Sequence, residues 1–100
     1  MIYLTQLIYI QEGSEKVFDE FEAVAIPIIA KYNGKLLLRI RPPASSVVEC
    51  EIESPYEIHL ACFDSDADYE AFKHDEERKR FLYLKDKAIR TVILIQGFVL

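Results

Sequence analysis

One short segment, residues 36 to 41, constrains most strongly how this chain can fold. Its sequence, Leu-Leu-Leu-Arg-Ile-Arg, is typical of a β-strand, in which successive side chains point to opposite faces. Strict alternation gives one apolar face and one half-cationic face, formed by Leu36, Leu38 and Ile40 and by Leu37, Arg39 and Arg41 respectively. The apolar face suits a hydrophobic core, so the arginines must face water, a partner subunit or a ligand.

The composition indicates one acidic domain. The chain has 100 residues, of which 51% are hydrophobic, and we expect a single domain over residues 1–100. The formal net charge is -5, which argues against nucleic acid as a partner because nucleic-acid-binding domains usually carry a basic excess. The one basic cluster, residues 78–80, directly follows three acidic residues, a pattern typical of a solvated helix face.

Runs rich in β-branched and aromatic residues predict four strands, separated by segments that contain Gly, Pro or Ser. A further segment with alternating glutamates predicts a short edge strand whose acidic face is solvated. The four strands cover residues 2–11, 35–41, 56–63 and 89–99, and the edge strand covers residues 47–53.

Apolar residues at helical spacing predict two helical regions between these strands. The first covers residues 14–32 and ends at Asn33, which tolerates a left-handed backbone. The second begins at Ser65, in an approximate capping box, and reaches residue 87. It either breaks near residues 73–75 or continues as one helix.

The order strand, helix, strand, strand, helix, strand is that of the ferredoxin-like fold, an α+β class with a four-stranded antiparallel sheet. We expect the sheet order 4-1-3-2 and both helical regions on one face of the sheet, because crossovers are right-handed. Alternation then predicts the residues of the open face as Tyr3, Thr5, Leu7, Tyr9, Leu37, Arg39, His59, Phe63, Val92 and Leu94. Such an apolar face is rarely left in water, so we expect a homodimer formed through it.

Several short motifs resemble those of a known family. They are Tyr32-Asn33-Gly34-Lys35, Arg39 near the end of its strand, Glu49 after Val48, Phe63-Asp64-Ser65 and Ile95-Gln96-Gly97. Together they are similar to the pattern of the uncharacterised domain of unknown function 1330, which belongs to the dimeric α+β barrel superfamily. The resemblance implies a dimeric α+β barrel. Some relatives in that superfamily are cofactor-independent monooxygenases or isomerases, but the family name itself supplies no reaction.

The chain departs from the family pattern at three positions. It has Asn33 where the family has a second glycine, Cys62 where the family has an acidic residue and Phe72 where the family has a tryptophan. If that acidic residue serves a shared chemistry, position 62 does not supply it in this chain.

Arg39 is the main candidate for binding an anionic ligand, since a guanidinium donates two parallel hydrogen bonds to a carboxylate or phosphate. The alternative is a structural ion pair with Glu49 or Glu57. Tyrosines combine an apolar ring with a polar tip and are candidates to line the same site, although packing explains them equally well. The tyrosines in question are Tyr3, Tyr9 and Tyr32.

His59 is the candidate catalytic residue, because an imidazole exchanges protons near neutral pH, and a hydrogen-bonded interface role is the alternative. Cys50 and Cys62 lack the spacing of a metal or redox site, so we expect two buried, reduced thiols and no metal. The sequence contains no Gly-rich phosphate loop and no nucleophile elbow, and we expect no cofactor.

The first ten residues carry no basic segment or cleavage site typical of a signal peptide. No apolar run approaches the ~20 residues that span a bilayer. We therefore expect a cytoplasmic protein without membrane contact.

Two functional hypotheses remain open at this stage. In the first, a homodimer binds or transforms a small anionic or aromatic molecule in a pocket between sheet and helices or beside the open sheet face, with Arg39 and His59 in the site. In the second, the protein is a non-catalytic dimerisation module without a small-molecule substrate, and Arg39 only forms an ion pair. The sequence does not decide whether the protein is an enzyme.

Overall fold

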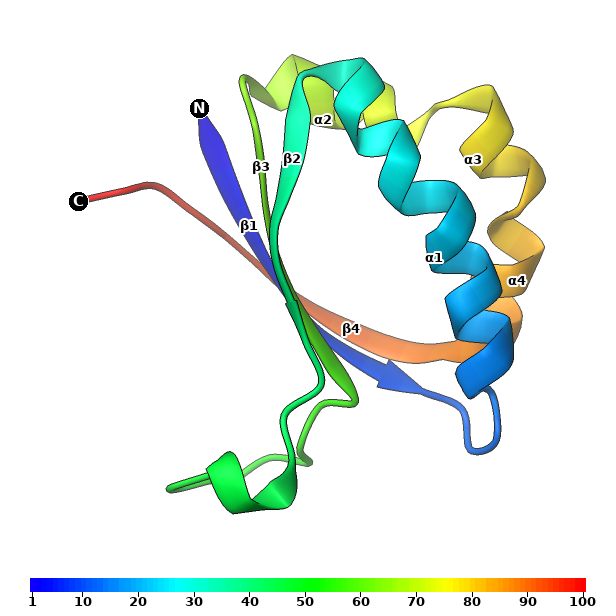
Figure 1. The fold of residues 1–100 in the computed structure, drawn as a ribbon. Helices are drawn as coiled ribbons and strands as arrows, with labels where there is room; N and C mark the ends of the chain where they lie inside the picture. Colours follow the sequence, from blue (N-terminus) through cyan, green and yellow to red (C-terminus); the bar gives the residue numbers. More distant parts are fainter.

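A computed structural model describes all 100 residues and has the predicted α+β ferredoxin-like fold (Figure 1). The four strands form one antiparallel sheet in the order β2-β3-β1-β4, as predicted, and the helices cover one face of it. The strands are β1 (Ile2–Ile10), β2 (Gly34–Ile40), β3 (Glu57–Phe63) and β4 (Ile89–Gly97), and the helices are α1 (Glu15–Ile29), α2 (Asp66–Lys73), α3 (Glu76–Arg80) and α4 (Leu82–Ala88). Short 3-10 turns occupy Ala30–Tyr32 and Ala44–Ser46.

The junction between α1 and β2 depends on two residues that the sequence singled out. Asn33 has a left-handed backbone with φ of 58°, which ends the helical region as predicted. At Gly34 an added Cβ would lie 2.6 Å from side-chain atoms of both Ile29 and Phe63. Only glycine therefore lets the end of α1 pack directly on the sheet.

The second helical region breaks near residues 73–75, one of the two predicted alternatives. Ser65 accepts a hydrogen bond from the Asp68 backbone N–H and starts α2, while Asp75 accepts one from the Arg78 backbone N–H and starts α3. A further break at Phe81 separates α3 from α4.

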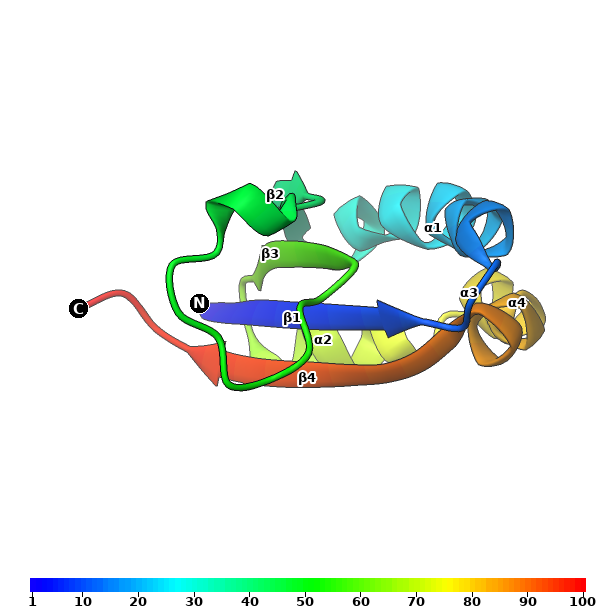
Figure 2. The same ribbon diagram turned by 90° about the horizontal axis from the view of Figure 1, so that it is seen from below.

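The edge strand predicted over residues 47–53 is wrong, because this segment is an irregular loop. The segment pairs with neither of the outer strands, β2 and β4, so its alternating glutamates do not form part of the sheet. The loop instead crosses the open face near β1 and β4, where the Glu53 carbonyl accepts a hydrogen bond from the Tyr9 hydroxyl at 2.7 Å (Figure 2). Cys50 in this loop is exposed rather than buried, whereas Cys62 is buried as predicted.

A β-bulge in β2 reverses the predicted faces of its arginines. Leu36 lies opposite Ala61 and Leu38 lies opposite Leu60, so one extra residue is inserted between them. Arg39 consequently lies opposite His59, and both side chains point toward the helices rather than to the open face. Strict alternation cannot anticipate an inserted residue, and it fails from this point of the strand onward.

The predicted faces of β3 and β4 are also wrong, whereas that of β1 is right. Leu4 and Ile8 of β1 are buried under the helices, which leaves the odd-numbered residues of β1 on the open face. The pairing of β1 with its neighbours then turns Phe63, Val92 and Leu94 toward the helices. A one-residue change of register moves all side chains of a strand to the other face. Because β3 and β4 carry apolar residues on both faces, their sequences do not indicate which face lies under the helices.

The core lies between the sheet and the helices in three small clusters. They centre on Leu4, Ile29 and Phe63, on Ile8, Phe18 and Ala88, and on Phe21, Ala25 and Leu84. The opposite face of the sheet is covered only where the loop crosses it. Its exposed apolar side chains include Leu38, Ile40, Ile93 and Ile95. None of the helices combines the length and the apolar character that crossing a bilayer requires.

Candidate functional site

A cavity of about 240 Å³ lies between the sheet and the helices. Fourteen of its 20 lining residues are hydrophobic, including four aromatic residues. Polar side chains reach it from β1, α1, β3 and α2 to α4, and they are Gln6, Glu22, His59, Lys73, Arg78 and Lys85. Leu94 on the edge strand β4 also lines the cavity and is 45% exposed, so the cavity meets solvent along this edge.

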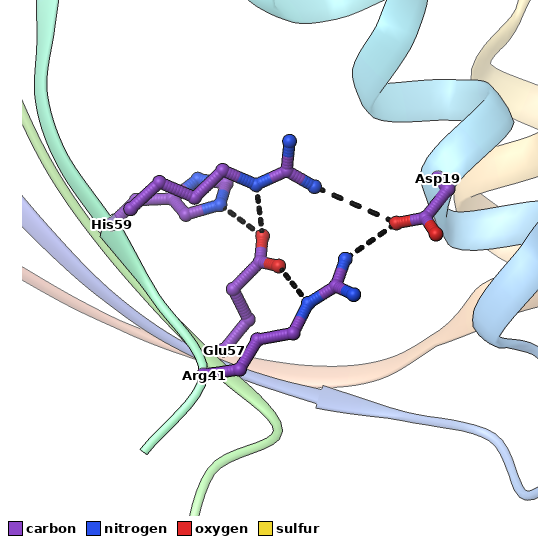
Figure 3. A network of polar contacts seen from close by, with 5 residues as sticks. Asp19, Arg41, Glu57 and His59 are labelled. Carbon is purple, nitrogen blue, oxygen red and sulfur yellow. Dashed lines mark hydrogen bonds and ion pairs between the residues drawn. The ribbon is translucent and has the colours of Figure 1, made fainter.

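A buried carboxylate, that of Glu57, organises the polar residues beside the cavity (Figure 3). It is completely buried and accepts hydrogen bonds from Arg39 Nε at 2.8 Å and Arg41 Nε at 2.6 Å. His59 Nε2 forms a third, very short contact with it. Because a buried charge is tolerated only when it is paired, these three donors make the position of Glu57 possible.

The same arginines connect the sheet to helix α1. Arg41 Nη2 donates to Asp19 Oδ1 at 2.5 Å, and Arg39 Nη2 lies 3.6 Å from the same oxygen. The Arg41 guanidinium also lies over the Tyr56 ring, 5.0 Å from its centre. Two arginines thus bridge an exposed carboxylate on α1 and a buried one on β3.

Electrostatics fix the protonation of this cluster. Burial by itself raises the pKa of Glu57, but hydrogen bonds from Arg39, Arg41 and His59 outweigh it and lower the pKa below its ordinary value. Burial lowers the pKa of His59, against the opposing effect of Glu57, so the imidazole is neutral at pH 7. Since a carboxylate only accepts, Nε2 of His59 carries the proton and Nδ1 keeps its lone pair.

Glu22 on α1 is in the opposite situation. It lines the cavity, is 7% exposed, and no hydrogen bond offsets the cost of its burial. Burial raises the pKa of Glu22 to about 7, although the charges of Arg39, Arg78 and Lys85 act to lower it. A carboxyl group that is half ionised at neutral pH therefore faces an apolar cavity.

Arg78 on α3 brings an unpaired donor to the cavity. Its Nε is buried and has no hydrogen-bond partner, while Nη1 donates to the Lys73 carbonyl at 3.2 Å. The guanidinium lies over the Phe72 ring at 5.0 Å and near the Phe21 ring at 5.9 Å. Burial lowers the pKa of Lys85, which also lines the cavity. A buried donor without an acceptor is costly, so the Arg78 side chain is held beside the cavity with one donor unsatisfied.

The structure brings only one of the predicted site residues, His59, into the lining of the cavity. Arg39 is in the ion pair with Glu57, one of the two predicted alternatives. The three tyrosines lie elsewhere: Tyr3 and Tyr9 are on the open face, and the Tyr32 hydroxyl donates to Asp75 at 2.6 Å.

Sequence reasoning missed Glu22, Arg78 and Lys85. Glu22 had a readable signal, because it follows Phe18 by four residues and precedes Ala25 by three, and so lies on the apolar stripe of the helix. Arg78 and Lys85 had none, since they belong to a mixed-charge segment that resembles a solvated surface. No group of three or more His, Cys, Asp or Glu side chains is arranged to hold a metal ion.

Comparison with known proteins shows the fold and no more. No sequence family and no curated protein matches the chain. A protein of unknown function from Rhodopseudomonas palustris is similar in structure, with a TM-score of 0.84 and 13% identity, covering 99% of this chain and 82% of that one. An uncharacterised NIPSNAP domain protein from Burkholderia xenovorans has a TM-score of 0.73 and 11% identity, and the match covers 100% of this chain and 95% of that one. A dimeric ferredoxin-like protein of unknown function from Jannaschia has a TM-score of 0.71 and 16% sequence identity, and the match covers 98% of each chain.

These neighbours share the ferredoxin-like α+β fold of this chain, and the Jannaschia protein is itself described as dimeric. They do not confirm the narrower resemblance to the domain of unknown function 1330. At such low identities they assign no reaction.

The raised pKa of Glu22 predicts a specific pH dependence of stability. The folded state holds a proton on Glu22 up to about pH 7, whereas the unfolded chain releases it near 4.5, so stability falls as pH rises between these values. Glu22→Gln should remove this loss and become more stable than the wild type above pH 7, by on the order of 3 kcal/mol. Urea denaturation from pH 4.5 to 8 measures the difference. Glu20→Gln, an exposed position on the same helix, should leave the wild-type profile unchanged, and parallel profiles for Glu22→Gln and wild type would contradict the assignment.

Proposed function

We propose that this protein is a homodimer that binds a small organic molecule with an apolar body and one anionic group in the cavity between sheet and helices. The observation that carries the proposal is an apolar cavity lined by two cationic side chains, Lys85 and Arg78, of which Arg78 has a buried Nε without an acceptor. Apolar pockets with a few converging polar groups are typical of small-molecule sites.

The size of the cavity limits the ligand. An apolar cavity of roughly 150 Å³ in another protein holds benzene. The present cavity, at about 240 Å³, has room for one ring or branched chain with a short polar extension. Phe21, Phe63 and Phe72 supply the apolar walls for such a body.

The polar residues favour a ligand with an acidic end and a second polar group. Arg78 and Lys85 line the cavity as cations and suit a carboxylate. His59 Nδ1 is left as an acceptor for a polar group of the ligand, because Glu57 holds the proton on the other ring nitrogen. A ligand contact of Arg39, Tyr3, Tyr9 or Tyr32 stays a prediction, as does a cytoplasmic location.

Three observations support a dimer formed through the open sheet face. The chain exposes 6520 Å². A compact monomer of this mass exposes about 5,800 Å². The open face carries a row of exposed apolar residues, which soluble monomers rarely leave uncovered. The Jannaschia protein, which has the same fold, is described as dimeric.

A thermal-shift panel of aromatic and branched aliphatic carboxylic acids tests the ligand proposal. An acid that binds should raise the melting temperature by several degrees at tenfold excess over its Kd, and the corresponding neutral amide should not. Arg78→Met should lose the shift, whereas Arg80→Met, an exposed position on the same helix, should keep it. Arg39→Ala in the same panel tests the predicted ligand contact of Arg39. No shift with any acid, or an equal shift in Arg78→Met, would count against the site and favour the non-catalytic dimerisation module.

Sedimentation equilibrium tests the dimer. The wild type should sediment at twice the mass of the 11.6 kDa chain at micromolar concentration. Leu38→Glu places a charge on the open face and should give monomers, because an unpaired buried charge is costly. Tyr83→Glu replaces an exposed apolar residue on α4 and should remain dimeric. A monomeric wild type, or a dimeric Leu38→Glu, contradicts this interface.

A further inference from the structure

The polar groups around the cavity differ in a way that binding alone does not explain. A site that only binds an anion needs cationic side chains such as Arg78 and Lys85. The lining of this cavity also contains the carboxyl group of Glu22, which would repel an anion when ionised. This carboxyl group costs stability and has no hydrogen bond to compensate it. An uncompensated buried ionisable group facing a cavity is a frequent mark of an active site.

We propose that Glu22 is a general base that removes a proton from a carbon atom next to a carbonyl group of the bound acid. The inference rests on the proposed function of the cavity and adds a reaction to it. The substrate class is an enolisable carboxylic acid, such as a 2-oxo acid with one ring or a branched chain.

The step balances without any further reactant. The C–H bond breaks and its proton forms an O–H bond on the Glu22 carboxylate, while the electron pair moves to the carbonyl oxygen and leaves an enolate. Lys85 and Arg78 line the same cavity and stabilise the negative charge of this enolate. Glu22 then returns the proton either to the same carbon atom, which regenerates the 2-oxo acid, or to the enolate oxygen, which gives its enol tautomer.

The surroundings of Glu22 suit both directions of this transfer. Charged groups face it from four elements: Arg39 on β2, Glu57 on β3, Arg78 on α3 and Lys85 on α4. Because burial outweighs the cations among them, Glu22 takes up and releases a proton near pH 7. Glu57 cannot serve in its place, since its carboxylate is occupied by Arg39, Arg41 and His59.

Hydrogen–deuterium exchange at a carbon atom of the ligand tests the proposal, because ligand binding alone does not accelerate this exchange. Phenylpyruvate and 4-methyl-2-oxopentanoate are incubated with the protein in D₂O, and loss of the C3 proton signal is followed by NMR above the protein-free rate. The wild type should accelerate exchange, with a rate that rises through a midpoint near pH 7. Glu22→Gln should bind both acids in the thermal-shift assay and exchange at least 100-fold more slowly. Glu20→Gln should match the wild type.

The outcomes separate this inference from the proposed function. Binding of either acid without accelerated exchange, or equal exchange in Glu22→Gln and wild type, overturns the role of Glu22 and leaves the binding function standing. Failure of both acids and of every acid in the thermal-shift panel to bind overturns both.

Discussion

The completely buried carboxylate of Glu57 is the constraint on which the arrangement of this protein depends. A charge without access to water must be paired, and the three donors that pair it come from β2, from the residue that directly follows β2 and from β3. Arg39 and Arg41 reach it only because the bulge in β2 turns them toward the helices. The same two guanidiniums reach Asp19, so the requirement of one carboxylate ties β2, β3 and α1 together.

Two carboxyl groups on the same side of the sheet thereby acquire opposite properties. Glu57 takes hydrogen bonds from both arginines and from His59, and its pKa falls, while Glu22 receives none and its pKa rises to about 7. When the environment shifts the pKa values of two carboxyl groups in opposite directions, one group stays ionised as a fixed charge and the other can carry a proton at neutral pH. The proposed binding and proton transfer follow from this separation, since Glu57 orients His59 and Glu22 stays free to react.

The sequence predicts the larger features of the fold because they follow from periodicity and turn chemistry. Local signals mark the end of the first helical region at Asn33 and the start of a new helix at Asp75. The sheet order follows from the succession of strands and helices along the chain. The faces of β2, β3 and β4 do not follow, because one inserted residue or a one-residue register change leaves the composition of a strand unchanged. His59 was found through its chemistry, whereas Arg78 required the tertiary structure to show that a charged segment turns inward.

A carboxyl-carbon NMR titration of the wild type, with Glu22 and Glu57 assigned through their glutamine variants, tests the central claim most directly. The structure predicts that Glu57 titrates below 4.5 and Glu22 at about 7 in the same protein. Observation of both groups near 4.5 would show that neither the buried ion-pair network nor the unpaired cavity carboxyl exists in solution as described.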